Sequence, residues 1–521
     1  MNSKIILCKG IKVDKDYNNV LSYSESQMLS LCNSNTHKIA ERSNYSFLRT
    51  TNSIYVDFTY SQCLQANYIA FQNPDYSNKW FFAWIDEVIY KSDKNCEITY
   101  TIDAWSTWFD KWSTKPCFVV REHVNDDEVG KYTFPENVEL GGYIADEIIR
   151  FNGFDNISYI IQVTEYTSST ASKPLAINYG GVYSAGGAYI CENIEQVVNI
   201  LQAYADRSKS DAVFSVYMCP SSLILNTSGS LQYSGQNTPA YLNEEITKPS
   251  SLNNYTPVNK KLLTYPYVGL VVSNNSGTSN TYQYELFNEI DELPNKCIFN
   301  IKGVPTVGAS IKCVPFNYKN NSENDNEEEG IIGGKFPTLS WSEDSYTNWL
   351  TQNSVNIGVG IASDVMNIIA GIGLMATGGG APAGASALAS TGLSIANKIG
   401  QFYQHSLTPN SARGNTNGGD INTSSNTNTF YFYKMSIREE YARIIDSYFT
   451  RCGYAINKIK NPNITGRRYW NYIEIAGSEE IGYGTVPANF MSIINNACRK
   501  GVTIWHIHDN IGNYSLNNNI I

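Results

Sequence analysis

An internal segment of this 521-residue chain contains no charged side chain from Val365 to Asn397. It consists of two apolar pieces, 355–376 and 385–400, which are separated by the sequence TGGGAPAG. A Gly-, Asn-, Ser- and Thr-rich tract of linker composition follows at 411–429. The neutral stretch exceeds the roughly 20 residues that cross a bilayer as a helix. Because both pieces are rich in small residues that let helices approach closely, the pattern predicts a helical hairpin.

Three interpretations of this segment are open. A buried core element is one, although so much glycine makes a poor helix. A permanent membrane anchor is another, although the sequence has no second span and no basic flank. The third is a conditional membrane segment, which is concealed in an assembly and exposed later. The flexible glycines and the long polar tether favour this third interpretation.

The rest of the chain has the composition of a folded protein with several domains. The hydrophobic fraction of 42% and the aromatic fraction of 13% exclude global disorder. The length suggests about three or four domains. A net charge of −10 argues against a surface that coats nucleic acid, because such a surface needs basic patches. The charge still permits DNA to pass through a neutral or acidic channel, where repulsion prevents sticking.

Eleven cysteines are scattered through the chain without a CxxC pair. An odd number without close pairs fits neither a secreted disulfide framework nor a clustered zinc site. We therefore expect reduced, mostly buried thiols in a protein made in a cytoplasm. The N-terminus has only a short apolar stretch followed by charges, so it is predicted to be a first strand and not a signal peptide.

The predicted fold class is β-rich α+β with several domains and antiparallel sheets, because β-branched and aromatic runs separated by turn signals dominate the chain. The expected organisation is an N-terminal β-domain at 1–125, a mixed α/β inserted domain at 126–255, a second β segment at 256–349, the long apolar Gly/Ala-rich loop with its polar tether at 350–428, and a C-terminal unit at 429–521.

The sequence pattern of the C-terminal unit is the clearest in the chain. It predicts the order strand–helix–strand–strand–helix–strand. Ser436 and Glu439 form a capping-box pattern for the first helix, and Gly453 stands where a left-handed C-cap belongs. A second helix ends at Gly501, and a strand over 502–509 closes the set. The βαββαβ order predicts a ferredoxin-like unit.

A search for catalytic chemistry finds little. His506 and His508 would share one face of a strand and could ligate a metal with Asp509, but ordinary hydrogen bonds are the favoured interpretation because no further ligand is visible. Cys452 and Cys498 lie on apolar helix faces, where a buried thiol is the default.

Acidic neighbours, which could serve a glycoside hydrolase, are not singled out by any pattern. These pairs are Asp86/Glu87, Asp126/Asp127 and Glu479/Glu480. We therefore predict no catalytic residue, no metal and no cofactor. A cell-wall hydrolase remains the enzymatic alternative, and the Tyr- and Asn-rich composition leaves a receptor-binding adhesin as a third class.

Six distinctive blocks of sequence occur at both ends of the chain and in the middle: NYIAFQNPDYSNKWFFAWIDEVIYK (67–91), IDAWSTWFD (102–110), FVVREHV (118–124), LLTYPYV (262–268), RCGYAINKIKNPNITGRRYWNYIEI (451–475) and GVTIWHIHDNIGNYS (501–515). These blocks resemble the tail knob, or distal tail tube, proteins of small short-tailed phages of the Picovirinae type. The apolar segment lies between the middle block and the last two.

This resemblance implies a homohexamer at the tail tip of the virion, with β-rich tube domains and a lumen that conducts DNA without sequence-specific binding. The implied partners are other copies of the chain, proximal tail or collar proteins, the phage DNA and lipids of the host cytoplasmic membrane. The hydrophobic loops would plug the tube before infection and then enter that membrane.

The resemblance also assigns a role to the large apolar side chains of the loop, which would insert into the membrane. They are Val355, Ile357, Val359, Ile361, Val365, Met366, Ile368, Ile369, Ile372, Leu374, Met375, Leu388, Leu393, Ile395 and Ile399. The loop would be tethered by 349–356 before it and by 411–428 after it. Asp364 and Lys398 would mark polar ends or a lumen face, because isolated charges that face lipid are costly.

Overall fold

A computed structural model of the chain describes residues 3–43, 45–48, 51–72, 74, 77–153, 157–163, 178–179, 182–183, 188–191, 196, 200, 212–220, 241–274, 277–302, 310–319, 327–335, 338–339 and 429–521. The chain divides into two compact units. The first contains residues 1–141, 254–262 and 439–521, and the second contains 142–253 and 263–438. The predicted β-rich, multidomain class is confirmed.

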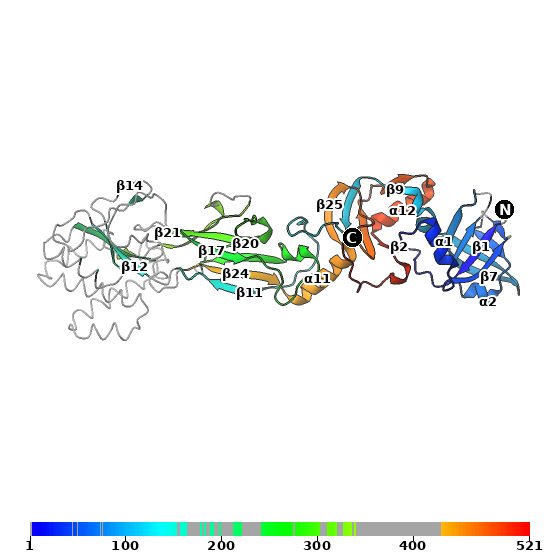
Figure 1. Ribbon diagram of the computed structural model, residues 1–521, viewed down its shortest axis with the longest axis horizontal. Helices are drawn as coiled ribbons and strands as arrows, with labels where there is room; N and C mark the ends of the chain where they lie inside the picture. Colours follow the sequence, from blue (N-terminus) through cyan, green and yellow to red (C-terminus); the bar gives the residue numbers. More distant parts are fainter. Residues whose placement is uncertain are drawn as a thin grey trace. The chain divides into compact units, whose positions relative to one another are not determined.

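The first unit begins with a seven-stranded antiparallel sheet, whose strands lie in the order β3 (Lys38–Ser43), β1 (Lys4–Cys8), β6 (Tyr68–Gln72), β7 (Trp80–Ser92), β8 (Asn95–Ile102), β5 (Ser53–Val56) and β4 (Ser46–Leu48). Alternate side chains of β1 face two different cores, because successive strand residues point to opposite sides. Helices α1 (Glu25–Asn33), α2 (Tyr60–Leu64) and α3 (Ala104–Trp108) contact strands of this sheet. Figure 1 labels the first two.

A second sheet of the same unit joins strands from both ends of the chain. Its order is β2 (Asn19–Leu21), β28 (Val502–Trp505), β26 (Trp470–Ile475), β10 (Cys117–Glu122) and β25 (Tyr454–Lys460), and it packs with α11 (Glu439–Cys452) and α12 (Ala488–Lys500). Trp470 and Trp505 of this sheet share one buried core with Ile6 and Cys8 of β1. A short pair, β9 (Trp112–Thr114) with β27 (Gly482–Gly484), completes the described strands of the unit.

The predicted ferredoxin-like unit is wrong, although its two helices and four strands occur in the predicted order, with the short strand β27 added between β26 and α12. The first predicted strand pairs in another sheet, and β10 takes a central place between β26 and β25. The only parallel pair in the described residues is β2 with β28, whereas the four strands β25, β10, β26 and β28 pair antiparallel. Local periodicity gives the order of elements, but the long-range insertion of β10 decides their pairing.

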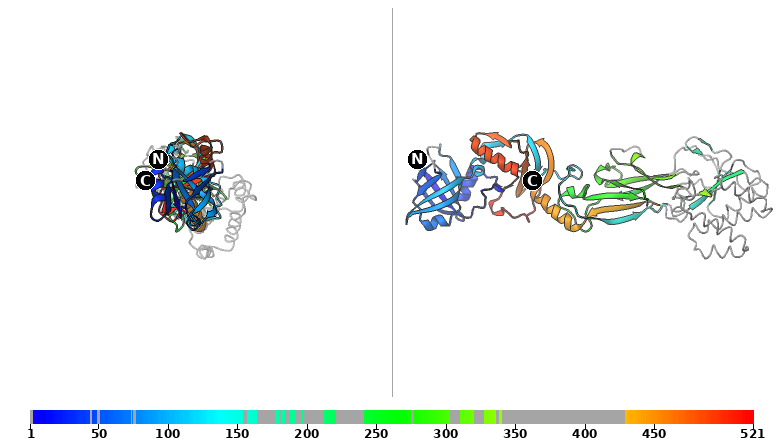
Figure 2. Two further views of the ribbon diagram at one scale, coloured as in Figure 1. Left: turned by 90° about the vertical axis from the view of Figure 1, so that its right-hand side faces the viewer. Right: turned by 180° about the vertical axis from the view of Figure 1, so that it is seen from behind.

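The second unit contains a sandwich of two four-stranded sheets. One sheet has the order β11 (Tyr143–Arg150), β24 (Tyr431–Ile437), β18 (Val268–Ser273) and β19 (Ser279–Tyr282), and the other has the order β17 (Tyr241–Thr247), β20 (Lys296–Lys302), β21 (Ser310–Pro315) and β22 (Ile331–Lys335). These sheets lie side by side in Figure 1 and in the right-hand view of Figure 2. Their contact includes Phe299 and Phe432, whose ring centroids are 5.2 Å apart.

The other described strands of this unit form two further sheets. One has the order β15 (Ala188–Cys191), β12 (Ile157–Val163), β16 (Val213–Pro220) and β23 (Thr338–Leu339), and the other pairs β13 (Asn178–Tyr179) with β14 (Val182–Tyr183).

Helix α11 begins three residues later than the sequence suggested. Ser436 stays in β24, where its hydroxyl donates to Asp146 Oδ1 over 2.8 Å, so the predicted capping box is wrong. The C-terminal end agrees with prediction: the N–H of Gly453 donates to the carbonyl of Phe449, and its φ of 66° is left-handed. Gly501 likewise ends α12.

Candidate functional site

The fifteen apolar side chains predicted for the membrane segment, Val355 to Ile399, lie outside the described residues, and so do both tethers. The structure instead shows where this segment is rooted. The chain is described up to β23, which ends at Leu339, and again from Thr429, which leads into β24. The residues at this second point form the candidate functional site, which we call the loop root.

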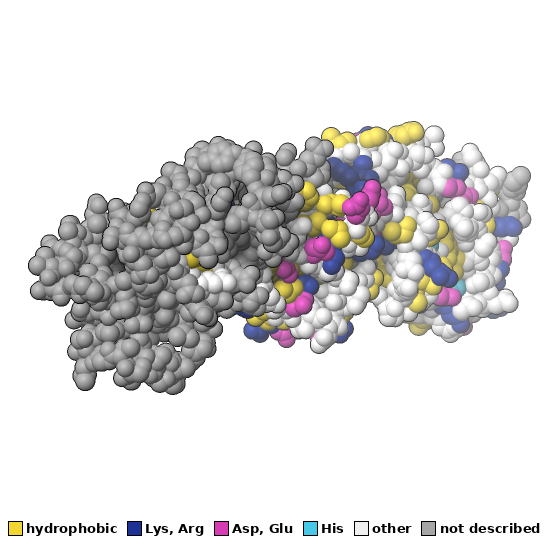
Figure 3. All heavy atoms as spheres, turned by 60° about the vertical axis from the view of Figure 1, so that its left-hand side comes forward, with side chains coloured by type: hydrophobic (Ala, Val, Ile, Leu, Met, Phe, Trp, Pro, Cys, Tyr) yellow, Lys and Arg dark blue, Asp and Glu magenta, His cyan; other side chains and the backbone are white. Residues whose placement is uncertain are grey.

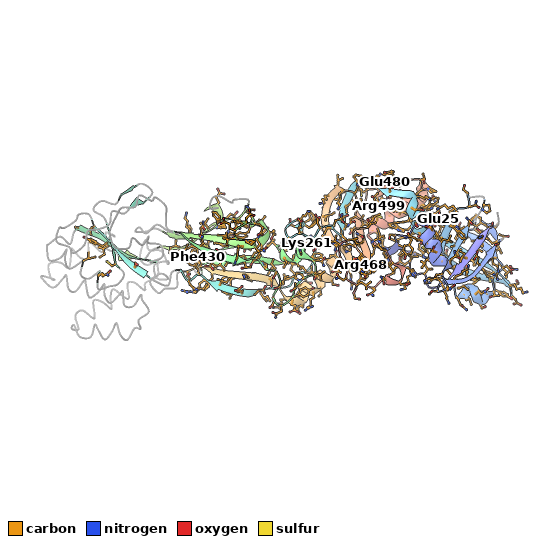
Figure 4. All side chains as sticks on the ribbon, viewed as in Figure 1. Glu25, Lys261, Phe430, Arg468, Glu480 and Arg499 are labelled. Carbon is orange, nitrogen blue, oxygen red and sulfur yellow. The ribbon has the colours of Figure 1, made fainter. Side chains whose placement is uncertain are left out.

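The loop root is fixed by buried hydrogen bonds to the end of β11. The hydroxyl of Thr429 donates to the carbonyl of Phe151 over 2.6 Å. The N–H of Phe151 donates to the carbonyl of Phe430 over 2.9 Å. Thr429 and Phe430 are 2% and 1% exposed, so the first residues after the long segment are already part of the core. Figure 4 labels Phe430 at this place in the sandwich.

A glycine in β22 makes room for the aromatic ring. A Cβ added at Gly333 would lie 2.9 Å from Phe430 Cζ and 3.2 Å from the carbonyl oxygen of Ile311. Any larger residue must therefore displace the ring or the neighbouring strand. The loop root combines an aromatic anchor with a small residue, and it contains no titratable group. This arrangement can hold a strand in place, but it cannot carry out acid–base chemistry.

The two C-terminal histidines do not come together, because β28 ends at Trp505. His506 Nδ1 and Nε2 lie 2.7 Å from Ser22 Oγ and 3.0 Å from Asn471 Oδ1. His508 lies instead beside His37, with ring centroids 4.8 Å apart. His37, which sequence reasoning did not connect with this pair, forms with His508 and Asp509 a group of possible metal ligands.

The hydrogen bonds of His508 do not fit a metal. Its Nε2 accepts the backbone N–H of Lys12 over 3.2 Å, so Nδ1 carries the proton that Asp509 Oδ1 accepts over 3.0 Å. If Nδ1 bound a metal, the proton would have to move to Nε2. The Nε2–H and the backbone N–H of Lys12 would then be two donors facing each other without an acceptor. The Lys12 ammonium, which donates to the Asp509 carbonyl, adds a positive charge nearby. The hydrogen-bonded interpretation of these histidines is therefore favoured.

Both candidate nucleophiles and one acid of each pair have surroundings that the structure describes. Burial raises the pKa of the Cys452 and Cys498 thiols, which disfavours the reactive thiolate. The carboxylates of Asp86, Asp126 and Glu480 each pair with a lysine, so they act as surface ion pairs. On the face shown in Figure 3, blue and magenta side chains are interspersed.

A buried ionic cluster in the first unit was not foreseen from the sequence. Glu136 comes from the loop after β10, and its fully buried side chain pairs with both Arg121 and Lys261. It also accepts the N–H of Ala455 over 2.9 Å. Arg121 in turn donates to the carbonyl of Gly453 over 2.8 Å. Figure 4 labels Lys261, which belongs to the segment 254–262. The cluster ties that segment to β10 and β25.

A second buried acid holds the same segment to α11. Asp446 accepts the N–H of Val258 over 2.7 Å, the N–H of Asn259 over 3.0 Å and the Asn259 amide over 2.7 Å. The Tyr255 hydroxyl donates to it as well. Sequence reasoning missed Glu136 and Asp446 because, apart from Arg121, their partners lie more than a hundred residues away. For Asp446, an isolated acid inside an apolar stripe of a helix was the only available signal.

Among the described helices, none has the length and apolarity needed to cross a bilayer.

Comparisons with known proteins identify relatives along nearly the whole chain. The sequence family described as the C-terminal domain of the Bacillus phage phi29 tail knob protein gp9 matches residues 232–519. A second family, the caudoviral major tail protein N-terminus, matches residues 1–113.

Individual relatives agree with these families. The chain is 23% identical to tail knob protein gp9 of Bacillus phage phi29, over 90% of this chain and 89% of that protein. It is also 23% identical to the gp9 protein of Bacillus phage PZA, over 92% and 90% of the two chains. The fold resembles the solved structure of the bacteriophage C1 tail knob protein gp12 with a TM-score of 0.60 and 14% identity, covering 100% of both chains.

Proposed function

The chain belongs to the family of the phage phi29 tail knob protein gp9, and from that premise we propose that it forms a homohexameric, DNA-conducting tube at the tip of a short phage tail. As a tail knob protein it is a component of the virion. In this proposal the β-rich segments 1–125 and 256–349 build the tube region, and 429–521 completes it. Apolar loops at 350–428 plug the tube and later penetrate the host cytoplasmic membrane. The role is structural and not enzymatic.

One observation carries the membrane part of the proposal. The charge-free residues 365–397 are followed by a polar tether that ends in the loop root, where Thr429 and Phe430 are buried. In this proposal the charge-free residues move into the membrane, while the loop root keeps the following strand in place in the fold. Several copies of a small-residue hairpin can satisfy their backbones as helices and pack around a common axis.

In a ring, each apolar loop needs only a weak affinity for the bilayer to open a path through it. Once one loop has entered the bilayer, the others are held near the same patch of lipid at high effective concentration. DNA would then pass through a lumen that does not bind it, which is compatible with the net charge of −10. Proximal tail or collar proteins would hold the other end of the tube.

Dye release from liposomes tests the membrane role. The purified protein is compared with a variant that lacks residues 356–420 and retains the loop root. We expect the complete chain to release dye and the deletion variant to lose that activity while keeping its oligomeric state. Undiminished leakage by the deletion variant would contradict the proposal.

Two further measurements separate the alternatives. Native mass spectrometry of the complete chain should show six copies, and a monomer at micromolar concentration would remove the tube. Zymography on purified peptidoglycan should show no clearing. A clear zone abolished by one carboxylate substitution would favour a cell-wall hydrolase instead.

A further inference from the structure

The sheet that contains the loop root has an unusual central strand. In β24 the side chains of Phe432 and Ser436 point into the sandwich, where both are fully buried. The alternate side chains, Tyr431, Tyr433 and Met435, point to the opposite side and are only partly covered. A strand whose other face meets water normally carries polar residues there. The outward residues of β24 are instead aromatic and apolar, which is typical of a strand whose second face is also covered.

The neighbouring strands extend this pattern across the sheet. The register places Ile148 of β11 beside Tyr433, and Tyr433 beside Val271 of β18. One row further along, Ala145 pairs with Met435. Ile148 is 58% exposed, and Tyr143, at the start of β11, is 46% exposed. We call the surface formed by Tyr143, Ala145, Ile148, Val271, Tyr433 and Met435 the outer face.

The outer face lacks acidic groups, although the chain is acidic overall. The two carboxylates of β11 bind partners outside the outer face. Asp146 accepts hydrogen bonds from Ser436 Oγ and from the N–H of Asn253. Glu147 pairs with Lys434 over 2.6 Å. A bulge between Ala145 and Glu147 produces this arrangement, because it shifts the alternation of the strand by one residue.

We propose that the outer face is the surface through which one copy of this chain contacts the next. Identical chains with a charge of −10 repel each other, so they can approach at least cost through a region free of carboxylates. An apolar centre with tyrosines at its edge is also the composition of a stable protein interface. This inference rests on the proposed self-assembly and specifies the surface that the assembly uses.

A closed ring of more than two copies requires a heterologous contact, in which the outer face of one copy meets a different surface of its neighbour. Disruption of the outer face alone should therefore weaken every contact in the ring. It should do so without affecting the fold of the isolated chain, because the side chains concerned point away from the core.

The test introduces one charge into the outer face. Ile148→Asp is compared with the matched control Ile332→Asp, which alters an isoleucine that is 52% exposed on β22, in the other sheet of the same sandwich. Native mass spectrometry and sedimentation of the complete chain measure the assembly. We expect the subunit dissociation constant to rise at least tenfold in Ile148→Asp and to change less than threefold in Ile332→Asp, with unchanged circular dichroism in both.

A second measurement covers the case in which the charged variant fails to fold. A photoreactive maleimide on Ile148→Cys should cross-link to a second copy of the chain, whereas the same label on Ile332→Cys should not; the wild-type protein provides the background. An intact ring in Ile148→Asp, or no chain-to-chain cross-link, would overturn the inference and leave the proposed function standing. A wild-type protein that does not assemble would instead contradict the proposed function itself.

Discussion

At the scale of single residues, the first unit depends on polar groups that are buried and satisfied. His123 is 3% exposed, and its Nε2–H donates to the carbonyl of Thr450 over 3.0 Å. Its Nδ1 accepts the N–H of Tyr472 over 2.8 Å, so a single neutral tautomer joins β26 to α11. Burial and the nearby charge of Arg467 lower the pKa of His123 to about 3. The imidazole therefore stays neutral in the folded protein.

This residue makes the first unit sensitive to acid. Its folded pKa lies below its ordinary value of 6.5, so the unfolded chain binds more protons between these limits. Stability is complete above about pH 6.5 and falls by about 1.4 kcal/mol per pH unit as the pH decreases toward 3. We expect urea unfolding at pH 7.0 and 5.0 to show a loss of about 2 kcal/mol from this one group.

His123→Asn removes the titration but also a hydrogen bond. It should cost about 1–3 kcal/mol at pH 7.0 and show a smaller loss on going to pH 5.0 than the wild type does. Burial also lowers the pKa of His506 and His508, so part of the pH dependence will remain. An identical pH dependence in wild type and variant would show that His123 does not titrate in this way.

At the scale of elements, local sequence predicted more than it did at the scale of residues. The helix ends at Gly453 and Gly501 follow from a glycine after an amphipathic stripe, and both are confirmed. The start of α11 was predicted wrongly, because the pairing of Ser436 with Ile144 and Val268 overrides a local capping pattern. Tertiary contacts therefore decide where a helix or strand begins and ends. Only some of these ends, such as those at a glycine, can be recognised from the neighbouring sequence.

Gly453 offers a test of one such end. Its φ of 66° favours glycine, and an added Cβ would lie 2.1 Å from the carbonyl oxygen of Glu122. We expect Gly453→Ala to destabilise the first unit by about 2–4 kcal/mol, since backbone strain and a steric overlap add together. Urea unfolding measures the change.

Gly512→Ala is the matched control, because Gly512 has a φ of 84° and nothing within 4 Å of an added Cβ. It should cost only about 1 kcal/mol, from backbone strain alone. Equal losses in the two variants would mean that the contact with Glu122 relaxes without cost.

At the scale of the whole molecule, the chain passes from one unit to the other at 141/142, 253/254, 262/263 and 438/439. Within the first unit, the acids at 136 and 446 hold the segment 254–262. Within the second, the loop root holds the start of β24. Each unit thus has its own buried anchor, and we expect the two units to unfold as separate transitions.

Scanning calorimetry at constant protein concentration checks this expectation. Glu136→Gln leaves Arg121 and Lys261 buried without their carboxylate and should cost the first unit about 3–5 kcal/mol. Phe430→Ala removes a buried ring and should cost the second unit about 3–5 kcal/mol. Each variant should lower the temperature of a different transition. A common shift of a single transition would mean that the units unfold together.

The sequence alone determined the properties that depend on neighbours along the chain. These are the β-rich class, the order of the two helices and four longer strands in 429–521, the two glycine helix ends and the position of the charge-free segment. All follow from periodicity, composition and single-residue conformational preference, which act over a few residues.

Only the tertiary structure decided which strands pair and which polar groups meet. The insertion of β10 between β26 and β25, the ion pair of Glu136 with Lys261, and the loop root of Thr429 and Phe430 against Phe151 all join residues far apart in sequence. Such contacts are selected by the burial of whole surfaces and by the need to satisfy every buried polar group. Neither requirement can be read from a local pattern.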